Sequence, residues 1–140
     1  MEVYFLIVFF ILGTVLGSFY HVVGTRLPEG KSIVNPPSHC PKCKHRLKWY
    51  ELIPIISYVI QKGKCKECKA KIPINYMLME IVTGVLFAVC YNEFGFSSEL
   101  IVSLIFVSTI VINIISDIEY MIIIDETLVI STLLIIIVYL

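Results

Sequence analysis

The chain has 140 residues, 58% of them hydrophobic, and its mean hydropathy is +0.89. This composition excludes an ordinary soluble domain of the same length and indicates a membrane protein. The formal net charge of zero conceals an asymmetry. All 11 Lys and Arg residues lie between Arg26 and Lys71 with only three acids, so this segment carries a formal charge of +8.

The first apolar segment, from Val3 to Val23, is long enough to cross a membrane, whose hydrocarbon core needs about 20 residues in a helix. A secretory signal peptide would begin with basic residues, have a shorter apolar run and end at a small-residue cleavage site. This segment follows Met-Glu, and the first cation of the chain is Arg26. We therefore predict a retained transmembrane helix over residues 1–24.

The basic segment over residues 25–72 is predicted to be a cytoplasmic loop, because loops rich in Lys and Arg stay on the cytoplasmic side of a membrane. The same rule places the N-terminus outside. Clusters of cations also occur in nucleic-acid-binding proteins. Here the Lys residues are scattered among cysteines and apolar residues beside a membrane, so we expect membrane lipids, and no nucleic acid, as the partner of this charge.

The loop contains two C-x2-C pairs separated by 21 residues, formed by Cys40, Cys43, Cys65 and Cys68. Two such pairs commonly bind one tetrahedral zinc ion. Two disulfides are the alternative, but they require an oxidising compartment, and the charge of the loop predicts the cytoplasm. Because four thiolates close the coordination shell, we predict that the zinc is structural rather than catalytic.

The segment between the two cysteine pairs, WYELIPIISYVI over residues 49–60, is too short to span a membrane and is interrupted by Pro54. It predicts an interfacial or re-entrant segment on the membrane surface. His39 and His45 flank the first cysteine pair, and either could replace a cysteine as a ligand, but we interpret them as solvated loop residues. Cys90 is interpreted as an apolar helix residue. Zinc would supply folding energy that so small a loop lacks.

Residues 73–140 are predicted to form three further transmembrane helices, over Tyr76–Tyr91, Leu100–Ser116 and Thr127–Leu140. The turn between the first two contains acids and no cation, which agrees with a position outside the cell. The last segment is short, and we expect that the chain stops inside a membrane helix. The predicted fold is an all-α, polytopic membrane protein with a zinc-binding cytoplasmic loop.

Asp117 follows the third apolar segment, on the predicted cytoplasmic side. An ionisable group at membrane depth is costly, so a functional role is the default hypothesis; the alternative is that the helix ends there and the carboxylate faces water. An aspartyl protease needs two carboxylates about 3 Å apart that share one proton. Asp125 is eight residues further along, which is about 12 Å in a helix. We therefore expect the second carboxylate to come from another helix.

Five motifs occur in order along the chain: GSFYHVVGTRLPEGKSIVNPPSHCPKC, LKWYELIPIISY, the second C-x2-C pair, IPINYMLMEIVTG and DIEYMIIID. In order and spacing they resemble the type IV prepilin peptidases, the leader peptidases and N-methyltransferases of bacterial pilus, competence and type II secretion systems. The resemblance implies a multi-pass aspartic endopeptidase of the bacterial inner membrane. Such an enzyme cleaves the leader of type IV pilin-like precursors at the cytoplasmic face and methylates the new N-terminus with S-adenosylmethionine.

By the same resemblance, Asp117 is the first catalytic aspartate, Asp125 has a supporting position, and the cysteine loop belongs to the region associated with methylation. Two departures from the family pattern stand out. Ile124 replaces a Pro, and the Gly-x-Gly-Asp motif that holds the second catalytic aspartate does not occur before Leu140. We therefore expect a fragment of a longer protein, a truncated gene product or half of a split enzyme.

Two other functions are compatible with these residues: a non-catalytic membrane adaptor with a zinc-binding loop, and a module with methyltransferase activity alone. A zinc-dependent hydrolase is disfavoured, because four thiolates close the shell and no H-E-x-x-H motif occurs. Arg26, Glu51 and Glu80 lie in the family-like motifs and are interpreted as interface or snorkelling residues.

Overall fold

The computed structural model describes residues 2–140, and this part of the chain contains helices and no strand. The four long helices are α1 (Glu2–Arg26), α3 (Asn75–Phe94), α4 (Ser98–Tyr120) and α5 (Asp125–Tyr139). Between α1 and α3 lie only the 3-10 turn η1 (Trp49–Glu51) and the short helix α2 (Ile56–Ile60). The predicted all-α fold is confirmed.

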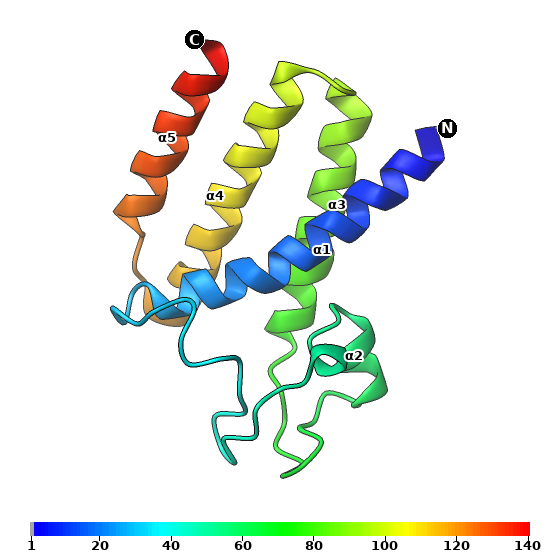
Figure 1. Cartoon of the computed structure of the whole chain (residues 1–140), viewed down its shortest axis with the longest axis vertical. Coiled ribbons are helices and arrows are strands. Elements are labelled where there is room, and N and C mark those ends of the chain that lie inside the picture. Colours follow the sequence, from blue (N-terminus) through cyan, green and yellow to red (C-terminus); the bar gives the residue numbers. More distant parts are fainter. Residues whose placement is uncertain (1) are drawn as a thin grey trace.

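The helices form a small bundle with the loop at one end (Figure 1). Helices α3, α4 and α5 lie side by side, and α1 runs obliquely across α3 toward the end of α4. Both termini point away from the long loop of residues 27–74, which extends below the point where α1 ends and α3 begins. The loop therefore lies at the same end of the bundle as the turn between α4 and α5.

Three helices, α1, α3 and α4, are long and apolar enough to cross a membrane. Their outward side chains, such as Ile7, Ile11 and Phe106, are apolar and exposed, as expected where lipid is the solvent. The predicted fourth segment is also a helix, α5, but it has 15 residues. At 1.5 Å per residue it is about 22 Å long, shorter than the hydrocarbon core of about 30 Å.

Helices α1 and α3 cross at very short range because small residues face each other. A Cβ added to Gly13 would lie 2.7 Å from the Cα of Gly84, and one added to Gly17 would lie 2.9 Å from the Oγ1 of Thr83. Such stripes of small residues let the backbones of membrane helices approach closely, where dispersion replaces the hydrophobic effect as the attraction. The crossing fixes the position of α1 against α3 around Gly13 and Gly17.

The turn between α4 and α5 is held by the side chain of Asn113. Its Oδ1 accepts the backbone N–H of Ile124 at 2.8 Å, and its Nδ2 donates to the Oγ1 of Thr127 at 2.9 Å. Met121 closes α4 in the left-handed conformation, with φ of 55°. Ile124 therefore uses a backbone N–H that a proline, expected here from the family pattern, would lack.

Candidate metal centre and the cavity beside it

Each cysteine pair is built on the same backbone turn. The N–H of Lys44 donates to the carbonyl of Cys40 at 2.9 Å, and the N–H of Lys69 donates to the carbonyl of Cys65 at 3.0 Å. Lys44 and Lys69 both have a positive φ, 57° and 60°. The two turns thus present their thiols in the same way, although they are far apart in the sequence.

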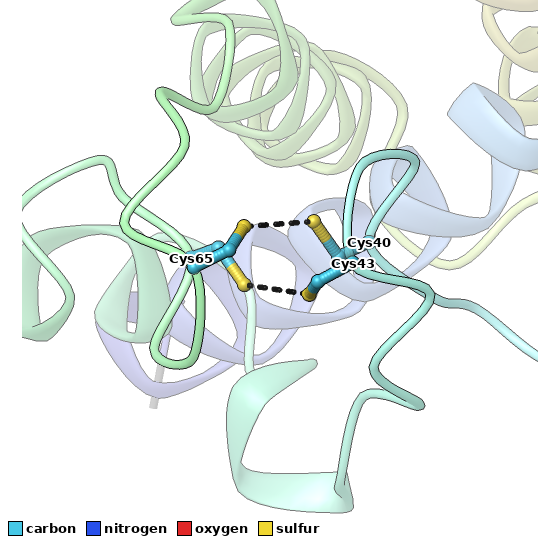
Figure 2. Close-up of side chains that lie close together, drawn as sticks. Cys40, Cys43 and Cys65 are labelled. Carbon is cyan, nitrogen blue, oxygen red and sulfur yellow. Dashed lines mark hydrogen bonds between the residues drawn. The ribbon is translucent and has the colours of Figure 1, made fainter.

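The four predicted ligands come together (Figure 2). Cys40 Sγ lies 3.7 Å from Cys68 Sγ, Cys43 Sγ lies 3.8 Å from Cys65 Sγ, and all four sulfurs are within 4.8 Å of one another. Sulfurs bound tetrahedrally at about 2.3 Å from one zinc ion lie about 3.8 Å apart. The donor set and its spacing therefore fit a structural zinc ion with a closed shell.

The local electrostatics also favour a cation among the thiols. Backbone N–H groups of Cys43 and Lys42 point at Cys40 and hold the pKa of its thiol at about 6, so that it ionises readily. The N–H of His45 has the same effect on Cys43, but burial and the adjoining thiols outweigh it and raise the pKa of Cys43 to about 12. A divalent cation would remove this repulsion, and its binding would release protons.

Neither flanking histidine belongs to the thiol cluster. His39 Nδ1 lies 2.9 Å from the carbonyl of Pro37, and His45 Nε2 lies 3.2 Å from Glu51 Oε2. Glu51 also accepts the backbone N–H of Lys48 at 2.8 Å, which caps η1. Burial raises the pKa of Glu51, but the Lys48 N–H and His45 outweigh it, so the pKa lies below its usual value. Glu51 thus organises the loop rather than lying at its surface.

A cavity of about 310 Å³ separates the cysteine turns from the helices. Its walls come from the last turns of α1, from both cysteine turns, from α2 and from the start of α3. His21, Glu51 and Glu80 line it, and all three are buried. His21 was not singled out from the sequence; the signal that could have found it is a titratable residue inside an otherwise apolar helix.

The loop is anchored to α3 at this cavity. Glu80 Oε2 accepts the backbone N–H of Ile55 at 2.7 Å. Ile55 has φ of 62° and ψ of −54°, and the N–H of Ile56 bonds to the carbonyl of Pro54, so Ile55 is the centre of a γ-turn. This turn is strained for a β-branched residue. The carboxylate of a membrane helix therefore holds a strained turn of the loop.

Asp117 is exposed in the last turn of α4, and Asp125 is exposed at the first residue of α5. The alternative in which the helix ends at Asp117 holds only in part: α4 continues to Tyr120, but the carboxylate is exposed. Tyr120 Oη donates to Glu29 Oε1 at 2.7 Å, which joins the end of α4 to the turn after α1. Asp117 thus lies at the loop end of the bundle, apart from the thiol cluster.

Comparison with known proteins places this architecture in a family. Residues 11–94, which include most of α1, the cysteine loop and α3, match the family described as "Bacterial Peptidase A24 N-terminal domain". The chain is 44% identical over 122 residues to a prepilin leader peptidase/N-methyltransferase of Bacillus subtilis, covering 87% of this chain and 49% of that protein. It is 43% identical over 107 residues to the protein of the same name from Myxococcus xanthus, covering 76% and 32%.

The chain belongs to the prepilin leader peptidase/N-methyltransferase family and contains its N-terminal domain. It spans between about a third and a half of the length of these two curated relatives. No solved structure matches it significantly.

Proposed function

We propose that this chain is the N-terminal part of an enzyme that cleaves and N-methylates type IV pilin-like precursors in the bacterial cytoplasmic membrane. The observation that carries the proposal is the match of residues 11–94 to the family, with 44% identity to a relative that has both activities in its name. The methyl donor in this proposal is S-adenosylmethionine. The pilus, competence and secretion systems that use such precursors are the expected context.

In this proposal the cysteine loop lies in the cytoplasm and the N-terminus outside. The charge of +8 between Arg26 and Lys71 supports this orientation. The exposed apolar side chains of Trp49, Ile56 and Ile60 suit contact between the η1–α2 segment and the membrane surface. Zinc bound by the four cysteines would fold the loop and hold it against α1 and α3, without taking part in the chemistry.

Asp117 is proposed as the first carboxylate of the aspartic protease site. It is exposed in the last turn of α4, where a precursor entering from the cytoplasm would reach it. The Gly-x-Gly-Asp motif expected to hold the partner carboxylate does not occur in the 140 residues. Proteolysis therefore requires a carboxylate supplied by another segment or another chain, since one carboxylate cannot fill both roles of the dyad.

The proposal is tested by supplying the chain and a matching pilin precursor in membranes, with and without a family segment that contains Gly-x-Gly-Asp. We expect leader cleavage only with that segment, and none in Asp117→Asn. Transfer of labelled methyl groups to a pre-cleaved pilin by the chain alone would define a methyltransferase module. Cleavage that persists in Asp117→Asn would refute the role of Asp117, and the absence of both activities in the completed protein would favour an adaptor.

A further inference from the structure

The cavity beside the cysteine turns contains all the buried side-chain polar atoms that have no hydrogen-bond partner within residues 2–140. They are the two ring nitrogens of His21 and the Oε1 of Glu51. His21 is 4% exposed and Glu51 is 6% exposed. A buried polar atom without a partner costs free energy, so a cluster of them on the wall of one cavity indicates a ligand that supplies the missing bonds.

The charge of the inner wall is negative. Glu51 and Glu80 both line the cavity, and within the described residues neither carboxylate forms an ion pair with a Lys or Arg. Arg26 also lines the cavity, but its Nη1 donates to the carbonyls of Ser32 and Pro36 in the loop. The two lysines of the lining, Lys42 and Lys71, are exposed, whereas Glu51 and Glu80 are buried. The buried end of the cavity suits a cation.

The spacing of the lining groups suits an organic cation better than a metal ion. In the part of the chain that the structure describes, the four cysteines are the one set of ligating atoms close enough to share an ion. His21, Glu51 and Glu80 are instead distributed around a volume of about 310 Å³, which is the size of a small-molecule site. The rings of Tyr58 and Tyr76 add aromatic walls, which suit an onium group and an apolar body.

We propose that this cavity binds an organic cation, an ammonium or sulfonium centre attached to a body with an aromatic group, between Glu51, Glu80 and His21. The carboxylates of Glu51 and Glu80 would attract the positive centre, and the two ring nitrogens of His21 would offer it or its neighbouring groups further hydrogen bonds. If the proposed function holds, two molecules could supply such a cation: a cleaved pilin, through its free amino terminus, and S-adenosylmethionine, through its sulfonium. Both would arrive at the cytoplasmic face, where the cavity opens beside the cysteine turns.

The test compares charged and neutral members of two ligand pairs by isothermal titration calorimetry on the purified, zinc-loaded chain in detergent. One pair is a short peptide amide with an aromatic first residue and its N-acetylated form. The other is S-adenosylmethionine and the neutral thioether S-adenosylhomocysteine. We expect at least one charged member to bind about tenfold or more tightly than its neutral counterpart, and the pair that discriminates identifies the source.

Glu80→Gln and Glu51→Gln should each reduce this preference to about twofold or less. Glu67→Gln is the matched control, because it removes an exposed carboxylate of the same loop that does not line the cavity. Glu80→Gln could disturb the turn at Ile55, whose N–H the carboxylate accepts. Glu51→Gln then tests the negative charge of the cavity on its own, because the new amide oxygen can still accept the N–H of Lys48. Helical circular dichroism and zinc content verify that each variant is folded.

Equal binding of charged and neutral members, no binding of any of the four compounds, or a preference that survives in both variants would overturn the proposal. These outcomes leave the proposed function intact, because leader cleavage and methyl transfer by the completed protein are measured separately. Conversely, the chain supplied with the Gly-x-Gly-Asp segment could lack both activities, which would refute the proposed function. The preference of the chain itself for charged ligands would still stand.

Discussion

Gly13 of α1 and Gly84 of α3 meet backbone to backbone, so closely that a Cβ on Gly13 would lie 2.7 Å from the Cα of Gly84. A Cβ on Gly84 would in turn lie 2.7 Å from the Cγ2 of Thr14 and 2.9 Å from the carbonyl oxygen of Phe10. Neither residue can acquire a side chain unless the helices separate.

Gly84→Leu should therefore destabilise the helix pair. Overpacking costs about 1–3 kcal/mol in a close-packed interior, and here the obstacle includes backbone, which cannot rotate away. Thermal unfolding in detergent measures the effect. Val85→Leu on the exposed side of the same helix is the control and should change the melting temperature little. Equal stability of the two variants would show that α1 and α3 do not cross as described.

The four-cysteine cluster should hold about one zinc ion per chain. Metal analysis of the purified protein is expected to give this ratio, and the double variant Cys40→Ser, Cys43→Ser should hold none. Cys90→Ser is the matched control, because Cys90 is buried in α3, outside the cluster. Native disulfides between the loop cysteines would contradict both the predicted metal and the proposed cytoplasmic position of the loop.

Glu51 should make the stability of the loop depend on pH. Its pKa is lowered in the folded protein, chiefly because the Lys48 N–H and His45 overcome the effect of burial. A lowered carboxylate pKa stabilises the fold fully above the unfolded value of about 4.3 and less as the pH falls through the folded value.

The comparison of wild type with Glu51→Gln isolates this contribution, since loss of metal at low pH affects both proteins. We expect the difference in melting temperature to be largest above about pH 4.3 and to shrink below it. Glu67→Gln, which removes an exposed carboxylate, should show no such trend. If the difference in melting temperature instead grew as the pH falls, the pKa of Glu51 would be raised rather than lowered in the folded protein.

Asn113→Leu should loosen the turn between α4 and α5. The substitution leaves the backbone N–H of Ile124 and the hydroxyl of Thr127 without their partner on α4. An unsatisfied buried donor costs about 1–3 kcal/mol. Hydrogen exchange at residues 121–127 measures the effect locally, and Asn92→Leu at the opposite end of the bundle is the control. Unchanged protection of Ile124 would contradict the role of Asn113.

The helices and the clustering of the four cysteines were predictable because their signals are local. Apolar runs of membrane length identified α1, α3 and α4, and C-x2-C spacing identified the four cysteines before any fold was known. The helix ends were less accurate. The uncharged run stops at Ser116, but α4 continues through Asp117 to Tyr120, since a helix does not need apolar residues once it leaves the membrane.

The cavity and its polar lining could not be predicted, because they depend on how distant segments pack. His21 and Glu80 lie on different membrane helices, and Glu51 lies in the loop between them. In the sequence each is an isolated polar residue that an interface or a helix end would explain equally well. Their common cavity arises only when the glycines let α1 and α3 cross and the cysteine turns lie against that crossing.

The bond from Glu80 to Ile55 bears on whether the loop can be treated as a portable unit. The γ-turn at Ile55 is strained, and its backbone N–H is satisfied by a carboxylate that belongs to a membrane helix. A loop transplanted onto a soluble scaffold would keep its metal ligands but lose this anchor. Soluble excised loops are therefore expected to bind zinc and yet adopt a different course between the cysteine turns, so the cysteine loop and the helix pair should be studied as one cooperative unit.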